Sequence, residues 1–240
     1  MIDKSRSRPI KFVIGVILFA YLSYFISDGA VGIDLLDVAL TSLVQISNSG
    51  IWTVFYKVIA WLASPGMDIL WIVILAFLMY GFKYKIQAFW TLAYMVGSMA
   101  LGFIVKHIIG RARPIGHLAQ DTGYSYPSGH VLGTFVLVSV IIMLIVPELP
   151  SYRMAMIVKW VSVVWFSIGS FSLRIYLNAH YPTDTIGGRA IGMVLESNHA
   201  MVLRFLGTRI IEMAVVLSLI FIKTINKLKL ILLFSRQPCH

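Results

Sequence analysis

The sequence is poor in charge, in acidic residues and in cysteine. Only 12% of its 240 residues are charged, whereas about a quarter of the residues of a soluble domain are charged. Asp and Glu number 10 against 20 Lys and Arg, which gives a formal net charge of +10. Cys239 is the single cysteine, and this excludes an intrachain disulfide and a cysteine-based metal site.

The sequence is correspondingly rich in apolar residues. They make up 59% of the chain, and the mean hydropathy is +0.86. Such a composition is too apolar for a water-soluble core and indicates a protein of the bilayer. The length suits one compact bundle, so we expect a single domain over residues 1–240.

Charge-free runs predict an all-α, polytopic membrane bundle of about six transmembrane helices. Five spans are expected at residues 12–27, 67–82, 86–105, 131–147 and 154–171. The apolar stretch Thr185–Ile222 would measure about 57 Å as one helix, which exceeds one bilayer thickness. Either a sixth span of about 20 residues is followed by an interfacial segment, or two poor spans are present; we favour the first.

Three further segments complete this organisation. Residues 34–65 carry Asp34, Asp37 and Lys57 among apolar residues at helical spacing, which predicts an amphipathic segment at the interface or packed on the bundle. The basic N-terminus precedes an apolar run without a small-residue cleavage site, so we expect an uncleaved first helix. Residues 223–240 form a basic tail.

The basic residues fall between the apolar runs rather than along one face, which favours membrane topology over binding of nucleic acid. With a cytoplasmic N-terminus, the turn at Lys83 and Lys85, the turn at Arg153 and the basic tail also lie inside, as the positive-inside rule requires. Two long polar loops, Lys106–His130 and Ser172–Asp184, then lie on the outer face. Residues from both loops can therefore meet in one site.

Three cations of these loops suit an anionic ligand. Lys106, Arg113 and Arg174 lie close to the ends of predicted spans, where a cation is costly unless it is solvated or paired with an anion. The planar fork of arginine matches phosphate oxygens, and lysine adds a point charge. Arg111 and His117 lie in the same loop as candidates for substrate contact.

A second cluster, Pro127-Ser128-Gly129-His130, directly precedes an apolar helix. Ser128 suits the N-cap position, which would direct the backbone N–H groups of Gly129 and His130 away from the helix N-terminus. Such a terminus binds anions, and glycine lets a ligand approach closely.

The third cluster joins a histidine to a carboxylate. Pro182 suits the first turn of a following helix, and Asp184 would lie in the same turn, within reach of His180. A carboxylate fixes the tautomer of a histidine and leaves its other nitrogen free as a nucleophile. His130 would supply a second imidazole that protonates a leaving oxygen.

Simpler interpretations exist for each residue taken singly. His130 suits an ordinary helix end, Ser128 a plain cap, the arginines interfacial anchors, and the pair His180–Asp184 a structural hydrogen bond. The complete set on one face is much harder to explain in this way. His130, His180 and Asp184 could also bind zinc, but the three nearby cations oppose a metal ion, so we expect neither a metal nor a cofactor.

Together these motifs resemble the type 2 phosphatidic acid phosphatase family, whose signature is Lys-six-Arg-Pro, Pro-Ser-Gly-His and Ser-Arg-five-His-three-Asp. They stand in order within residues 67–188, as KHIIGRARP, PSGH and SLRIYLNAHYPTD. Leu173 separates Ser172 from Arg174, so the resemblance assigns Arg174 and not Ser172. Arg189 and Glu196 are unusual for a final span of this family.

The resemblance implies a six-helix membrane core and metal-independent hydrolysis through a phosphohistidine. His180 would attack phosphorus, Asp184 would orient it and His130 would protonate the leaving oxygen. The phosphate would be held by Lys106, Arg113, Ser128, Gly129 and Arg174.

We therefore expect a lipid phosphatase of a bacterial cytoplasmic membrane, with its site on the outer face. The expected substrate is undecaprenyl pyrophosphate, and phosphatidylglycerol phosphate or phosphatidic acid is the alternative. Two other classes remain open: a membrane anion transporter or lipid-binding protein, in which the cations serve only for binding, and a scaffold protein, in which the histidines are dispensable. The sequence does not indicate an oligomeric state.

Overall fold

The computed structural model describes residues 8–44, 50–115, 123–168 and 173–198. Helices dominate these segments, and no strand occurs in them. The long helices are α1 (Arg8–Ser27), α4 (Pro65–Gly81), α5 (Lys85–Ile109), α6 (Gly129–Val140), which continues as the π-helix η1 (Ile141–Ile145) and the 3-10 turn η2 (Val146–Glu148), α7 (Tyr152–Trp165) and an unlabelled helix over residues 182–198. The shorter helices are α2 (Val31–Val44), α3 (Gly50–Leu62) and α8 (Leu173–Tyr176).

Several of these helices are long and apolar enough to cross a bilayer. Four candidates occur within the described segments: Arg8–Ser27, Lys85–Ile109, Gly129–Glu148 and a stretch that begins at Tyr152. A fifth is the pair Val54–Leu62 and Pro65–Gly81, if the two helices form one span bent by 46°. The polytopic helical membrane fold is confirmed. The count of six stays a prediction, because the continuation of the helix over residues 182–198 lies outside the described residues, as does the basic tail.

The structure corrects the predicted ends of the first polar loop. Lys106 was expected in this loop, but α5 continues to Ile109 and Lys106 lies in its last turn. At the other end, α6 already begins at Gly129. Gly110 ends α5 with a left-handed conformation (φ 65°) and donates its N–H to the carbonyl of Lys106, a C-cap that glycine adopts without steric cost.

The predicted amphipathic segment, residues 34–65, contains most of α2 and all of α3. Asp37 on α2 is fully buried, whereas the Asp34 side chain is 69% exposed. Of the two acidic residues of α2, Asp37 therefore faces the interior of the protein and Asp34 faces outward.

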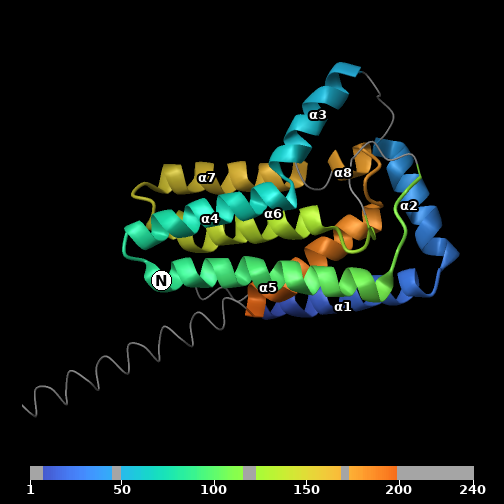
Figure 1. The fold of residues 1–240 in the computed structure, drawn as a ribbon, viewed down its shortest axis with the longest axis horizontal. Coiled ribbons are helices and arrows are strands. Elements are labelled where there is room, and N and C mark those ends of the chain that lie inside the picture. Colours follow the sequence, from blue (N-terminus) through green and yellow to red (C-terminus); the bar gives the residue numbers. More distant parts are fainter. Residues whose placement is uncertain (1–7, 45–49, 116–122, 169–172, 199–240) are drawn as a thin grey trace, which may run out of the picture. The chain divides into compact units, whose positions relative to one another are not determined.

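Helix α6 occupies the centre of the bundle, with α4 and α5 packed against it (Figure 1). Ten of its twelve residues are buried. Its apolar side chains share the largest buried cluster with residues of α4, α5 and the helix over residues 182–198: Ile72, Tyr94, Met95, Leu132, Val136, Leu137, Val140 and Ile191.

Close packing joins the start of α6 to the helix over residues 182–198. A Cβ added at Gly188 would lie 2.7 Å from the carbonyl oxygen of Ser128, so this approach is open only to glycine. The backbone N–H of Ser128 donates to the carbonyl of Asp184 at 3.0 Å. The second and third sequence clusters are thus connected directly through the backbone.

Candidate active site

Lys106 at the end of α5 and Arg113 in the segment that follows hold this segment in place through hydrogen bonds to backbone carbonyls. Lys106 Nζ donates to the carbonyl of Tyr124 at 2.9 Å. Arg113 donates from Nε to the carbonyl of Gly123 at 3.0 Å and from Nη1 to the carbonyl of Ala179 at 2.8 Å. The two ends of the first polar loop and the segment before His180 are thereby brought together.

The Pro-Ser-Gly-His cluster forms the predicted helix N-terminus. Ser128 is the N-cap of α6, and its Oγ accepts from the backbone N–H of Val131 at 3.5 Å. A Cβ at Gly129 would lie 3.8 Å from Lys106 Cε, so the Lys106 side chain passes beside the helix start. Positive charge from the lysine and from the helix N-terminus therefore converges on one point.

His180 and Asp184 meet as predicted, and both are buried. His180 Nδ1 lies 3.5 Å from Asp184 Oδ2, and the same oxygen accepts from the backbone N–H of Tyr181 at 2.9 Å. On the other side of the ring, Arg113 Nη1 lies 3.3 Å from His180 Nε2. Because a guanidinium can only donate, Nε2 must be the acceptor, which places the ring proton on Nδ1, beside Asp184.

Burial keeps this imidazole neutral. It lowers the pKa of His180 from 6.5 to about 4, although the contact with Asp184 acts in the opposite direction. At neutral pH the ring therefore keeps a lone pair on Nε2, to which Arg113 donates. Neutral, oriented imidazole is the form required of a nucleophile.

His130 and Arg174 are the other two predicted site residues near His180. The ring centroids of His130 and His180 are 6.2 Å apart. Arg174, Arg113 and Lys106 lie close enough to His130 for their positive charges to interact electrostatically with its ring. Arg174 itself is buried at α8, where Nη2 donates to the carbonyl of Ala60 at 3.2 Å. The structure thus gathers the three cations and two histidines that were expected to meet.

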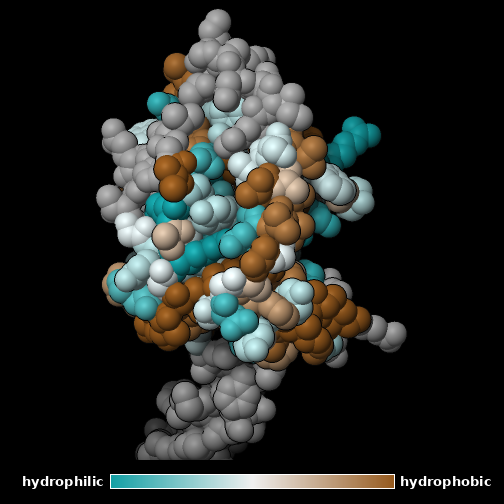
Figure 2. Space-filling view, turned by 90° about the vertical axis from the view of Figure 1, so that its right-hand side faces the viewer, coloured by the Kyte–Doolittle hydropathy of each residue, from teal (hydrophilic) through white to brown (hydrophobic). Residues whose placement is uncertain are grey.

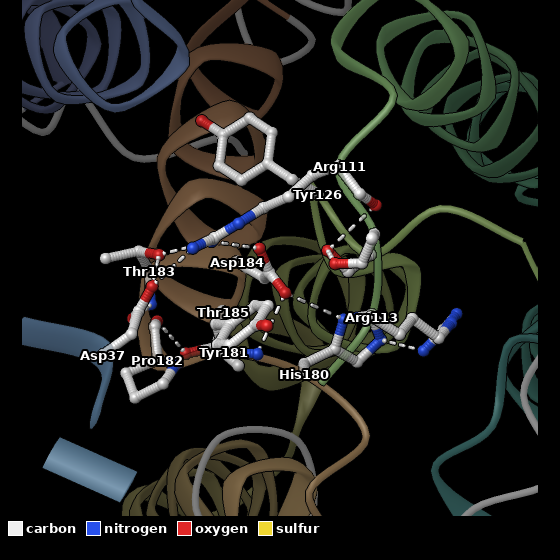
Figure 3. A network of polar contacts seen from close by, with 12 residues as sticks. Asp37, Arg111, Arg113, Tyr126, His180, Tyr181, Pro182, Thr183, Asp184 and Thr185 are labelled. Carbon is white, nitrogen blue, oxygen red and sulfur yellow. Dashed lines mark hydrogen bonds and ion pairs between the residues drawn. The ribbon is translucent and has the colours of Figure 1, made fainter. Parts of the chain in front are cut away.

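The sequence suggested Arg111 as a candidate for substrate contact, but the structure shows it bonded to two protein carboxylates. Its Nη1 donates to Asp184 Oδ1 and to Thr183 Oγ1, both at 2.8 Å, and its Nη2 donates to Asp37 Oδ2 at 2.7 Å. In Figure 3 it lies between the two carboxylates. Burial opposes its charge, but Asp184 and Asp37 outweigh this and raise the pKa of Arg111. Arg111 holds protein carboxylates rather than presenting a free guanidinium to a ligand.

Asp37 is the site residue that sequence reasoning missed. Besides Arg111, it accepts from the backbone N–H of Thr183 at 2.9 Å and from Thr183 Oγ1 at 2.7 Å. These bonds attach α2 to the start of the helix that carries Asp184. The only signal in the sequence was an acidic residue within an apolar helical pattern.

A cavity of about 740 Å³ begins at Lys106, Arg113 and His130. Its polar end is formed by Lys106, Arg113, Gly129 and His130. The remainder runs between α4, α5 and α6 and is lined mainly by apolar residues, namely Pro65, Ile69, Met99, Ala100, Phe103, Ile104 and Leu132. Figure 2 shows the end of the bundle that carries α2, where a hydrophilic centre is bordered by hydrophobic side chains.

Two residues of the polar loops, Ser172 and the candidate contact residue His117, lie outside the residues that the structure describes. Among the residues that the structure describes, no group of three His, Cys, Asp or Glu side chains is placed to hold a metal ion.

The sequence is similar to a known protein family and to known phosphatases. The model of the PAP2 superfamily matches residues 87–205. The chain is 32% identical over 100 residues to phosphatidylglycerophosphatase B of Bacillus subtilis (strain 168), covering 40% of this chain and 47% of that protein. It is 32% identical over 123 residues to lipid A 1-phosphatase of Rhizobium etli, covering 43% of this chain and 46% of that protein. The chain spans about half the length of these curated relatives.

The fold is similar to that of a solved structure. A transmembrane PAP2 type phosphatidylglycerolphosphate phosphatase from Bacillus subtilis matches with a TM-score of 0.70 at 22% identity. The match covers 82% of this chain and 96% of the other. At this identity the likeness concerns the fold.

We predict that Asp37 supports the site through Arg111. Asp37→Asn removes a fully buried carboxylate from its ion pair, which should cost about 3 kcal/mol in the free energy of unfolding. Asp34→Asn is the matched control, because the exposed Asp34 lies 3.6 Å from the same guanidinium and should cost less than about 1 kcal/mol. Denaturant unfolding in detergent measures both. Equal losses in the two variants would contradict the assignment.

A second prediction concerns pH. Below pH 6.5 the unfolded chain protonates His180 while the folded chain does so only near pH 4, so folding stability should fall as the pH is lowered through this range. The loss reaches about 3 kcal/mol. In His180→Gln the corresponding slope should be absent, whatever its stability at neutral pH. Unfolding curves between pH 7.5 and 4 provide the comparison, and parallel slopes in both proteins would refute a neutral buried His180.

Proposed function

We propose that this chain, which belongs to the PAP2 superfamily, is a membrane phosphatase that removes the terminal phosphate from a lipid through a phosphohistidine on His180. The observation that carries the proposal is the environment of that ring. Nδ1 faces Asp184, Nε2 faces Arg113, and the second imidazole of His130 lies 6.2 Å away. Binding alone does not require two neighbouring buried imidazoles, one of them oriented by a carboxylate.

The first step follows from this geometry. His180 Nε2 attacks phosphorus, and a P–N bond forms while the bond from phosphorus to the lipid oxygen breaks. The leaving oxygen takes its proton from His130, which enters this step as the imidazolium favoured by the negative charge of the bound phosphate and becomes neutral. The ring centroids of His130 and His180 are 6.2 Å apart, so both imidazoles border the same space and act there on one bound phosphate.

The second step returns both histidines to their starting state. Water attacks the phosphohistidine and gives its proton to His130, while the P–N bond breaks and its electrons return to Nε2. Inorganic phosphate leaves. Asp184 stabilises the ring while it carries positive charge, as a carboxylate does for a catalytic imidazole.

The phosphate is held by Lys106, Arg113 and Arg174 together with the N–H groups at the start of α6. Phosphoryl transfer depends largely on positioning and on stabilising charge on the equatorial oxygens. Arg113 Nη1 donates to His180 Nε2 at 3.3 Å. On binding, the phosphate oxygens would draw this guanidinium from the nitrogen and free the lone pair at the moment of use.

The shape of the cavity supports a lipid substrate. Its polar end holds the cations, and its apolar part runs between α4, α5 and α6, where Met99, Phe103 and Leu132 can contact a hydrocarbon chain. Because a bilayer surrounds these helices, a lipid can enter sideways with its phosphate leading. A small water-soluble phosphate would leave most of this lining without contact.

We favour phosphatidylglycerol phosphate as the substrate, because one curated relative carries the name phosphatidylglycerophosphatase B. Phosphatidic acid presents the same terminal monoester. Undecaprenyl pyrophosphate stays a further prediction from the sequence, resting on the inferred outer-face position of the site. We propose that the site lies on the outer side of the cytoplasmic membrane, since basic turns favour a cytoplasmic N-terminus. Phosphate release from a panel of these three lipids ranks them.

A transporter or lipid-binding protein would also need the cations. It would not release phosphate from a lipid, and it would not depend on His130. Vanadate-sensitive release of inorganic phosphate by the purified protein therefore separates the two classes.

The role of His130 predicts a dependence on the leaving group. An alkyl oxygen of a lipid needs a proton as it leaves, whereas a nitrophenolate does not. His130→Asn should slow the first turnover of a lipid phosphate by about 10²–10⁴-fold and leave the first turnover of p-nitrophenyl phosphate almost unchanged. His180→Asn should abolish both. Equal slowing of the two substrates by His130→Asn would remove His130 from the role of acid.

The apolar part of the cavity predicts a chain-length effect. Ala100 lies on its wall, so Ala100→Trp should lower kcat/KM for a long-chain lipid phosphate by about tenfold or more while sparing a short soluble monoester. Val96→Trp is the control, because this exposed residue of α5 does not line the cavity. Kinetics in mixed micelles measure both. Unchanged lipid kinetics in Ala100→Trp would show that the hydrocarbon chain of the lipid binds elsewhere on the protein.

A further inference from the structure

A second cavity lies in the part of the bundle away from the catalytic residues. It has a volume of about 540 Å³ and is lined by α1, α6 with its continuation, α7 and the helix over residues 182–198. It shares no lining residue with the catalytic cavity. Along α6 its lining runs from Phe135 to Pro147, whereas the catalytic histidine of this helix is at its first turn.

Positive charge dominates this cavity. Arg8, Lys11, Lys159 and Arg189 line it, and Glu196 is the single carboxylate among its lining residues. Lys11 Nζ lies 3.6 Å from Glu196 Oε1. With Lys11 paired to Glu196, Lys159 and Arg189 still add two positive charges to the lining.

These charges interrupt stretches that are otherwise apolar. Lys159 lies in the middle of α7. Arg189 lies within the helix over residues 182–198, with its guanidinium 5.8 Å from the Phe166 ring centroid. A charged residue within a membrane helix is costly unless it is solvated or paired, so such residues mark a candidate site for a ligand of opposite charge. The catalytic mechanism uses none of them.

The rest of the lining is apolar and elongated. From Phe135 to Pro147 the helix axis advances about 18 Å, which is comparable with an acyl chain in one leaflet. The apolar lining residues are Phe135, Val138, Ile142, Met143, Val146, Val163 and Phe166. A ligand that matches the cavity must combine a negative head with a long hydrocarbon tail.

We propose that this cavity binds an anionic phospholipid of the bilayer, with its phosphate held by the cations and one acyl chain against α6 and α7. Basic pockets between membrane helices bind anionic lipid headgroups in this way. Inorganic phosphate would match the positive charge but not the apolar wall, and a neutral phospholipid would bring no net negative charge to Lys159 and Arg189. Bound lipid would hold α7 against the helix over residues 182–198 and stabilise the fold by mass action.

The test is retention of phosphatidylglycerol, a phosphodiester without a terminal phosphate. Native mass spectrometry of the full chain from mixed micelles should show retained phosphatidylglycerol and far less phosphatidylcholine. In the double variant Lys159→Gln, Arg189→Gln, the apparent affinity for phosphatidylglycerol should fall about 30-fold. Arg153→Gln is the matched control: Arg153 is an exposed cation of α7 outside the cavity, and retention should persist there.

Further variants separate this cavity from the catalytic one. Arg113→Gln removes a cation of the catalytic cavity and should keep the retained lipid. Lys159→Glu alone should reduce retention if the double variant folds poorly. Folding is checked by the hydrolysis of a short soluble phosphate monoester in neutral micelles, which the Lys159 and Arg189 variants should leave unchanged. Retention that is equal for both lipids, or unchanged in the folded Lys159→Glu variant, would overturn the proposal.

Discussion

Asp184 is the carboxylate on which the geometry of the site depends. It lies fully buried between Arg111, the backbone N–H of Tyr181 and His180. A buried carboxylate is stable only when charge and hydrogen bonds compensate the lost water. Arg111 supplies that charge and shares it with Asp37. The orientation of His180 thus rests on an ion-pair network that reaches back to α2, about 150 residues earlier in the chain.

The helix ends explain why charged groups can gather here within an apolar protein. Gly110 ends α5 just after Lys106, and Ser128 begins α6 just before His130. Lys106 and His130 therefore lie at one end of the bundle, while their helices continue through its apolar body. The close contact of Gly188 with the start of α6 and the backbone bond from Ser128 to Asp184 keep the two halves of the site in register.

Much of the site was predictable because its signals are local. The Ser128 cap, the pairing of His180 with Asp184 four residues later and the apolar runs follow from short-range spacing, and the structure confirms them. Asp37 was not predictable, because its partner Arg111 is 74 residues away and a single Asp in an amphipathic pattern normally faces water. The end of α5 was placed too early for a related reason: Lys106 was read as a loop residue, although a last-turn cation suits a helix C-terminus.

The central claim is that His180 Nε2 becomes covalently phosphorylated. Rapid acid- and base-quench of the wild-type protein with a ³²P-labelled lipid phosphate, followed by peptide mapping, tests this directly. We expect an acid-labile, base-stable label on the peptide that contains His180, formed within the first turnover and absent from His180→Asn. A fully active protein without label on that peptide, or label that persists in His180→Asn, would contradict the account.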